Sequence, residues 1–388
     1  MTAFGLDAPG ERFSLVVGGP FHAALQRLGL TDADQLPSGR AAIGAALLAW
    51  LAPALLAIVQ TFVDRSYTGW GFFSDWMVYT RYLVAIWIMI ATERYADGRL
   101  FALAHHFREA QLLSEDDLPA FDAAIEAADR RSGSALAELI IAVAALVWSG
   151  VTAGFTVLLA GTSWEGSVVG GEAVLSWAGE AVRLLSTPFF LFLLARWLWR
   201  FLVWTVLLYR IARLPLQLMP LHPDRSAGLG FLAIYPTIFS GFIFAQSCVV
   251  ASSMLKDLSL EHHSAQTVWF ALAGWLAVCL CLGVGPLLVF IRPLYDVRER
   301  ALLEYGRLVN QHHSAFHRKW VANRRNGKEL LGSADVSSAS DLNATVETAQ
   351  DMRLIPVDAV AVKQILVAAG LPMLAVVLRQ VPLAELVH

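Results

Sequence analysis

Four arginines occupy one strongly apolar stretch, "LLARWLWRFLVWTVLLYRIAR", which runs from Leu193 to Arg213. If the stretch is helical, successive side chains turn by about 100°, so Arg200 and Arg210 each lie about 40° from Arg196. Guanidinium groups are costly in hydrocarbon unless they meet water or a counter-charge. Arginines on one face of a membrane helix could therefore line a wet path, gate it, or pair with acidic side chains on neighbouring helices.

Other ionisable residues in apolar surroundings are the candidate partners of this arginine face. Glu138 precedes one apolar stretch, Asp75 lies near the start of another, and Arg81 lies further along that second stretch. A helix that starts near Leu184 would place Arg196 about 18 Å deep at 1.5 Å per residue. Buried pairs that hold helices together and a path that attracts or gates anions are both compatible with this pattern.

Histidine doublets are the remaining chemical candidates. His262-His263 in a predicted loop could sense acidic pH. His313 and His317 are four residues apart on a predicted helix, a spacing that can place two imidazoles on one metal. That helix is basic and lacks the glutamate of zinc-protease motifs, so a face against phospholipid headgroups is the better interpretation. With no nucleotide-binding glycine loop or nucleophile elbow, the sequence predicts no cofactor, and an enzyme is the least supported class.

Composition determines the class of the protein. The 388 residues are 57% hydrophobic and 16% charged, with a net charge of −3. Such a chain has too little polar surface to coat a soluble core, so it is predicted to have a lipid bilayer as its partner. No basic run suggests nucleic acid as a partner. Three cysteines lie in predicted spans, where inert apolar side chains are expected: Cys248, Cys279 and Cys281.

Six stretches are long enough to cross the roughly 30 Å hydrocarbon core, which needs about 20 apolar residues. They are residues 41–62, 72–91, 139–159, 184–208, 228–254 and 265–291. A seventh, 359–378, is interrupted by Lys363 and Pro372. The sequence therefore predicts an all-α, polytopic membrane helical bundle of six or seven transmembrane helices.

Lys and Arg gather in alternate connections, which predicts a cytoplasmic N-terminus in a bacterial inner membrane. The cytoplasmic parts are then an N-terminal segment (1–40), a helical hairpin (93–134) and a helical segment (296–358). The hairpin and the segment extend helices of a transmembrane bundle that covers 41–295. Residues 359–388 are predicted as a seventh span or an interfacial helix.

One connection carries the motif "LHPDRSAGLGFL", Leu221 to Leu232, in which Asp224 or Ser226 is expected to cap the following helix. Together with "LLGSAD" at Leu330, "DL" at Asp341 and "MR" at Met352, it resembles a family of bacterial multi-pass inner-membrane proteins that have no assigned activity. The likeness covers roughly the second half of the chain and implies no reaction.

These features predict a channel or passive transport protein for an inorganic ion or small solute, with Arg196 and Arg200 on the permeation or gating face and Glu138 as a counter-charge. A homo-oligomer is expected, because one bundle with so few intramembrane charges has little room for a coupling site. The alternative is a membrane-anchored sensor or scaffold whose segment 296–358 recruits a partner.

Overall fold

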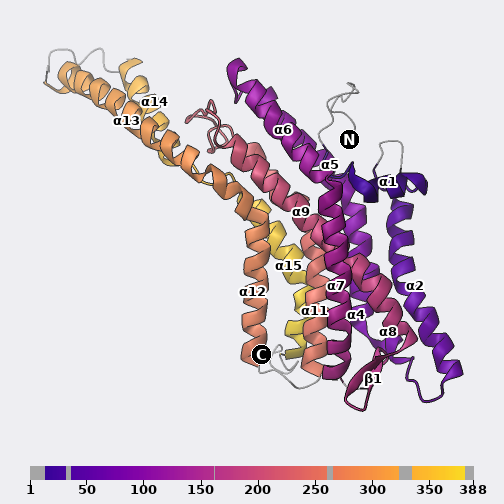
Figure 1. Cartoon of the computed structure of the whole chain (residues 1–388). Coiled ribbons are helices and arrows are strands. Elements are labelled where there is room, and N and C mark those ends of the chain that lie inside the picture. The colour runs from indigo at the N-terminus through magenta and orange to yellow at the C-terminus, as the bar shows by residue number, and fades with distance from the viewer. Residues whose placement is uncertain (1–13, 32–35, 161, 260–264, 323–333, 381–388) are drawn as a thin grey trace.

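The structure is a computed structural model that describes residues 14–31, 36–160, 162–259, 265–322 and 334–380. Nearly all described segments are helical (Figure 1). Six are long and apolar enough to cross a membrane. They are Gly39–Val63, Glu115–Leu159, Trp177–Ile211, Gly230–Lys256, Gln266–Ala322 and Ala359–Arg379. The predicted all-α membrane bundle is confirmed, and the doubtful stretch 359–378 is one of the six.

The first helices cover one side of the bundle. α1 (Gly19–Arg27) lies across the end of the bundle, and α2 (Gly39–Val63) runs along its length (Figure 1). The Ser38 hydroxyl starts α2 by accepting a 3.1 Å hydrogen bond from the N–H of Ala41. The buried face of α2 is largely alanine, and such small side chains allow neighbouring helices to approach closely. We call the two ends of the bundle the α1 end and the β1 end, after the elements that lie there.

The next crossing differs from the predicted span 72–91. After the short α3 (Gly71–Ser74), one continuous helix runs through α4 (Trp76–Val78), the π-helical η1 (Tyr79–Ala85) and α5 (Ile86–Glu109). This central helix, Trp76–Glu109, packs against α2, α9 and α11. It is absent from the six apolar segments, because polar side chains along its length lower its hydropathy. Residues 76–91 of the predicted span 72–91 lie in this helix, which continues to Glu109, and the span stays a prediction.

The middle of the chain forms the short helix α6, which packs on α9, and two further long helices. A 3₁₀ turn, η2 (Glu115–Asp117), leads into α6 (Leu118–Ser132), and α7 (Ala135–Ala160) then runs to the β1 end. There β1 (Gly166–Val169) pairs antiparallel with β2 (Glu172–Leu175), with Gly166 opposite Leu175. The chain returns through α8 (Trp177–Ala181), the π-helical η3 (Val182–Ser186) and α9 (Thr187–Ile211).

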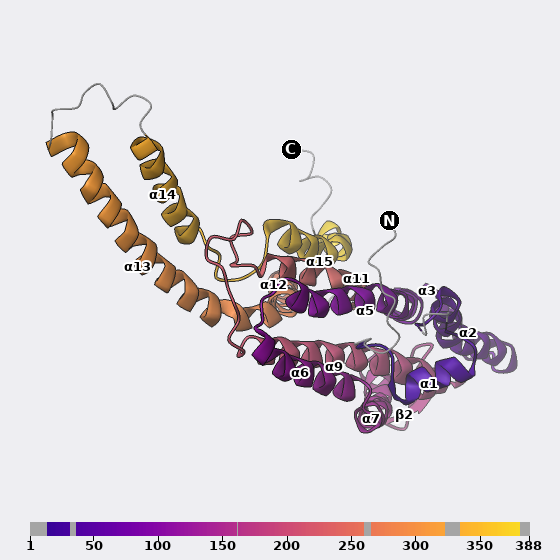
Figure 2. The ribbon, with the colours of Figure 1, turned by 90° about the horizontal axis from the view of Figure 1, so that it is seen from above.

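The last part of the chain completes the bundle and adds an arm. The 3₁₀ turn η4 (Gly230–Ile234), α10 (Tyr235–Ile238) and α11 (Ser240–Ser259) run to the β1 end, and α12 (Ala265–Val284) runs back. The 3₁₀ turn η5 (Gly285–Phe290) leads into α13 (Ile291–Phe316) and the π-helical η6 (His317–Ala322). α14 (Ala334–Gln350) packs on α13, and α15 (Ala359–Gln380) packs on α11 and α12. The α13–α14 arm projects from the bundle (Figures 1 and 2).

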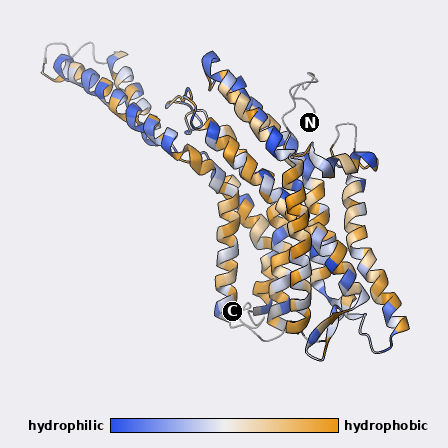
Figure 3. Ribbon diagram, viewed as in Figure 1, coloured by the Kyte–Doolittle hydropathy of each residue, from blue (hydrophilic) through white to orange (hydrophobic). Residues whose placement is uncertain are grey.

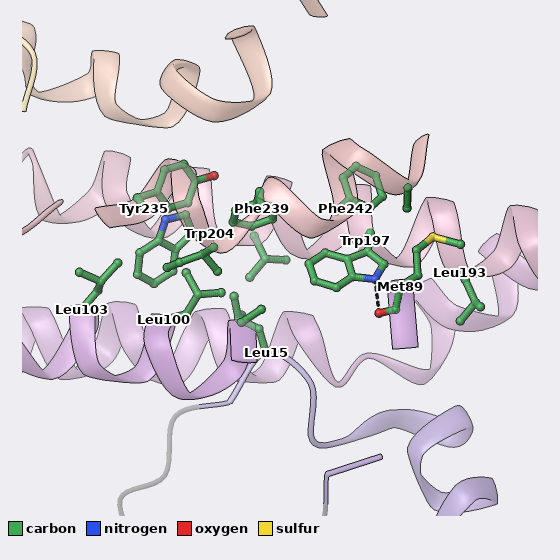
Figure 4. Packing of buried hydrophobic residues seen from close by; sticks show 14 of the residues in the cluster. Leu15, Met89, Leu100, Leu103, Leu193, Trp197, Trp204, Tyr235, Phe239 and Phe242 are labelled. Atoms are coloured by element: carbon green, nitrogen blue, oxygen red, sulfur yellow. Dashed lines mark hydrogen bonds between the residues drawn. The ribbon is translucent and has the colours of Figure 1, made fainter. Parts of the chain in front are cut away.

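Hydropathy separates the bundle from its projections. The bundle is predominantly apolar, whereas α6 and the α13–α14 arm contain many hydrophilic residues (Figure 3). The core lies between the central helix, α9 and α11, where Trp197 stacks on Phe242 and donates from Nε1 to the carbonyl of Met89 at 3.1 Å (Figure 4). This packing fixes the faces that α9 and the central helix present to each other.

The "LHPDRSAGLGFL" connection is an ordered turn. The carboxylate of Asp224 accepts hydrogen bonds from the N–H groups of Ser226, Gly228 and Gly230 at 2.7, 3.2 and 2.7 Å. The expectation that Asp224 or Ser226 is the N-cap is wrong, because Leu229 occupies that position and makes no side-chain capping bond. Asp224 reaches the start of the helix from five residues earlier instead, through the N–H of Gly230. Burial alone would raise the pKa of Asp224, but these backbone hydrogen bonds outweigh it and hold the pKa below its usual value. The N–H of Arg353 donates to the carbonyl of Arg225 at 2.7 Å, so two motifs of the family resemblance meet here.

Candidate functional site

A buried charge cluster lies near the α1 end of the bundle. It consists of Arg196 and Arg200 from α9, Glu93 from the central helix and Glu138 from α7, all at most 5% exposed. Arg196 donates from Nε to Glu138 Oε1 at 3.1 Å and from Nη1 to Glu93 Oε1 at 3.2 Å. Arg200 Nη1 donates to Glu93 Oε1 at 2.7 Å. The arginine face therefore meets carboxylates inside the protein.

The N-terminal segment covers the charge cluster. Leu15 and Val16 are buried, and Arg196 Nη2 donates to the carbonyl of Val16 at 3.3 Å. Asp97, one turn beyond Glu93, accepts from the Ser14 hydroxyl at 2.7 Å and from the N–H of Leu15 and Val16 at 3.0 and 3.2 Å. We call residues 14–22 the N-terminal strap, since they lie over the cluster and are hydrogen-bonded to it.

Two glycines allow the strap to approach Glu138. Gly18 and Gly19 both have positive φ, and a Cβ on Gly19 would lie 2.8 Å from the Glu138 carboxylate. Glu138 Oε2 accepts from the N–H of Phe21 at 2.9 Å, near the start of α1, where a negative charge is favoured by the helix dipole. The Phe21 ring lies 4.7 Å from the Arg196 guanidinium carbon. Glu138 thus joins α1, α7 and α9.

Several buried polar atoms around the cluster have no hydrogen-bond partner among the described residues. They are Oε2 of Glu93, Nη2 of Arg200, Nε2 of His22 and, further along the central helix, Nε of Arg81. Burial and the positive charge of Arg196 lower the pKa of His22 below its ordinary value, although Glu93 and Glu138 oppose this shift. Buried polar groups are nearly always paired in proteins, so the three unpaired atoms at the cluster, and the one on Arg81 further along the central helix, require an explanation.

Asp75 and Arg81, the other predicted partners, lie away from the cluster. Asp75 caps α4 near the β1 end by accepting from the N–H of Met77 at 3.0 Å. Asp75 Oδ2 also accepts from Lys256 Nζ at 2.8 Å and from Trp164 Nε1 at 3.1 Å. Arg81 packs over the ring of Phe190 at 5.8 Å. The expectation that these residues pair with the arginine face of α9 is wrong, because the central helix places them more than two turns from Glu93.

Three separate polar contacts lie along the central helix between the two charged regions. The Thr80 hydroxyl is 2.7 Å from that of Ser252 on α11, and the Tyr82 hydroxyl is 2.7 Å from that of Thr187 on α9. Gln246 Nε2 lies 3.4 Å from Met89 Sδ. We call this series, with Asp75 at one end and the charge cluster at the other, the polar column. Its residues come from the central helix, α9 and α11.

The polar column contains two π-helical segments. Tyr82 lies within η1, and Thr187 directly follows η3, so the hydroxyl contact joins two places where the helical hydrogen-bond pattern is locally altered. Single π-helical turns occur frequently at functional sites. The charge cluster contains two carboxylates, Glu93 and Glu138, and two guanidinium groups, Arg196 and Arg200. These two arginines therefore do not carry uncompensated positive charge.

Glu93 and Asp97 are site residues that were not predicted from the sequence. Both lie in a helical extension that was assigned to the hairpin 93–134. A signal was present, because Glu93 and Asp97 are four residues apart and share the face that continues the apolar stretch. Which arginine this face meets depends on the packing of α9 against the central helix, and hydropathy does not encode that packing.

The histidine predictions have different outcomes. His262 and His263 lie outside the described residues. His313 and His317, together with Ser314 and Arg318, line a shallow hollow on the arm. Within the described ranges, no group of three or more His, Cys, Asp or Glu side chains could hold a metal ion. Two imidazoles without a third ligand do not form a metal centre of the usual kind.

Comparison with known proteins supplies no relative. No protein-family model matches the chain, and neither a curated protein nor a solved structure is significantly similar to it. The functional argument therefore rests on the polar column, the charge cluster and the N-terminal strap.

Proposed function

We propose that this protein provides a gated passive pathway for a small inorganic ion or polar solute, and that the polar column on the central helix is this pathway in a closed state. The observation that carries the proposal is the set of buried atoms without partners on Arg81, Glu93, Arg200 and His22. A polar network that only holds helices together is expected to satisfy its members. A hydrated path needs polar groups with free hydrogen-bonding capacity.

Ion pairs occupy both ends of the column, and they are the proposed gates. Asp75 and Lys256 form the pair at the β1 end, and the charge cluster lies at the α1 end. In this proposal Arg196 and Arg200 act in gating and not as an anion-attracting lining, because Glu93 and Glu138 neutralise them. The strap over the cluster closes the path further, and its movement would open it.

The proposal includes the location and assembly of the protein. The distribution of Lys and Arg supports a bacterial inner membrane with the α1 end in the cytoplasm, so the strap would respond to cytoplasmic conditions. We also propose that the protein forms a homo-oligomer in which each chain holds its own column. Light scattering of the purified protein tests the oligomeric state independently of transport.

Flux through proteoliposomes tests the gate. The variant Glu93→Gln with Arg200→Gln removes two opposite charges together and leaves the Arg196–Glu138 pair, so the fold is retained. Fluorescent reporters for potassium, chloride and protons should show a severalfold faster flux of at least one ion than the wild type. The matched control is Glu126→Gln with Arg130→Gln, an exposed pair on α6. If the gate variant and the control have equal flux for every probe, the cluster has no gating role.

A second candidate function is supported by the α13–α14 arm. In α13 the buried residues are Leu294, Val297 and Ala301, all in its first half. The remainder of the arm projects from the bundle (Figure 2). A sensor or scaffold would use this arm to recruit a partner. Affinity capture with the full-length wild type should then retain a specific partner protein. The variant Leu303→Glu with Leu308→Glu, changed on the exposed face of α13, should lose that partner, whereas the gate variant should keep it.

A further inference from the structure

A groove lies beside the end of α9, on a different part of the α1 end from the charge cluster. It has a volume of about 800 Å³, and its walls are the end of α9, the connection Leu214–Leu218 and the segment Leu288–Arg300. This volume is within the range of small-molecule sites. None of the cluster or column residues lines it. The groove is therefore independent of the proposed pathway.

The walls of the groove combine apolar and cationic side chains. Leu214, Leu216 and Leu288 contribute apolar surface, and Arg213, Arg292 and Arg300 contribute positive charge. Asp296 is the one acidic side chain in the lining. Among the described residues, no carboxylate forms an ion pair with any of these three arginines. Such a lining is complementary to a molecule that has an anionic head and an apolar tail.

The groove lies where two crossing segments leave the apolar layer. The span Trp177–Ile211 ends two residues before Arg213. On the other wall, the apolar turn η5 passes into α13, whose second residue is Arg292. Tyr209 and Leu288 in the lining remain about half exposed, at 47% and 45%. Aromatic and basic side chains at this level are typical of the membrane interface. A lipid can reach such a groove from within its own leaflet.

We infer that this groove binds one anionic phospholipid, with its phosphate between Arg213 and Arg292 and the upper part of its acyl chains against Leu216 and Leu288. Arginine provides planar, charge-assisted hydrogen bonds to phosphate oxygens. Each cation near a membrane surface contributes about 1 kcal/mol to attraction of anionic lipid. Two guanidinium groups in one groove select a phospholipid with net negative charge over a zwitterionic one.

Lipid binding to the purified full-length protein tests this inference. Native mass spectrometry and thermal unfolding in detergent should show that phosphatidylglycerol binds and stabilises the wild type more than phosphatidylcholine. The variant Arg213→Gln with Arg292→Gln should bind phosphatidylglycerol about thirtyfold more weakly, as expected for the loss of two surface cations. The matched control is Arg210→Gln with Arg307→Gln, which removes two exposed arginines of α9 and α13 outside the groove and should retain wild-type affinity.

Three outcomes would overturn the inference. Equal stabilisation by phosphatidylglycerol and phosphatidylcholine would show that the groove does not select charge. An equal loss of phosphatidylglycerol affinity in the groove variant and in the control would show a diffuse electrostatic effect. Inorganic phosphate that stabilises the wild type as much as phosphatidylglycerol would show that a free anion, and not a lipid, is the ligand. Because the groove variant leaves Glu93 and Arg200 intact, failure here is distinguishable from failure of the proposed pathway.

Discussion

The two ends of the polar column contain ion pairs in opposite environments. At the α1 end, the Arg200 and Glu93 side chains are 3% and 1% exposed. At the β1 end, Lys256 is 40% exposed and Asp75 is 10% exposed. Removing one partner from a buried pair leaves an isolated charge in a medium that solvates it poorly, whereas water screens an exposed pair. The comparison shows that the α1-end cluster is a structural determinant as well as a proposed gate.

The largest effect is expected from separating the buried pair. Glu93→Leu alone should lower the free energy of unfolding by about 3–5 kcal/mol, because Arg200 would lose its carboxylate partner and stay buried. Glu93→Leu with Arg200→Met removes both charges and should recover most of this loss. Chemical denaturation in detergent micelles measures the free energy of unfolding of the single and the double variant. If the double variant is no more stable than the single one, the charges do not act as a pair.

A smaller loss of stability is expected from a substitution where the strap meets the cluster. In Gly19→Ala, the new Cβ would contact the Glu138 carboxylate, and such overpacking costs about 1–3 kcal/mol. Gly29 also has positive φ, but a Cβ there meets nothing within 4 Å. Gly29→Ala is therefore the control for backbone strain alone. Hydrogen exchange of residues 14–28 should increase more in Gly19→Ala, and an equal increase in both variants would contradict the close contact.

At the β1 end, removing one charge of the Asp75–Lys256 pair should lower the free energy of unfolding by about 1 kcal/mol or less, since Lys256 is partly solvated. Lys256→Gln removes the positive charge and leaves both Asp75 oxygens in place, Oδ1 for the N–H of Met77 and Oδ2 for that of Trp164, so it isolates the ion pair. Glu180→Gln, in the pair with Arg183 on α8 and η3, is the control. A loss as large as that of Glu93→Leu would show that the two ends are equally dependent on charge.

The smallest effect concerns pH. Because burial and Arg196 hold the pKa of His22 below 6.5, the charged imidazole is disfavoured in the folded state. The resulting stability is present above the unfolded pKa and is lost as pH falls through the folded one. The melting temperature should therefore decrease more between pH 7.5 and 5.5 in the wild type than in His22→Gln. His105→Gln, at an exposed site on α5, should behave like the wild type. If the melting temperatures of the wild type, His22→Gln and His105→Gln depend identically on pH, His22 is not the source of the pH dependence.

Hydropathy predicted five of the six apolar segments and left the sixth, 359–378, open. Hydropathy was least informative for the central helix, because Arg81 and Asp75, which caps α4, lower the mean hydropathy of this segment. Periodicity placed Arg196 and Arg200 together on one face of α9, and Glu138 was identified as a counter-charge. Glu93, the second counter-charge, was not identified, because its partner is more than 100 residues away in the chain.

The sequence by itself determined that this chain is a helical membrane protein, because apolar length and turn periodicity are local properties of the chain. It also determined that the arginines of α9 need compensation, since the cost of burying charge does not depend on the fold. Only the tertiary structure decided where that compensation comes from. Contacts between α9, α7, the central helix and the N-terminal strap bring together residues from four distant parts of the chain, and no local pattern specifies how those parts pack.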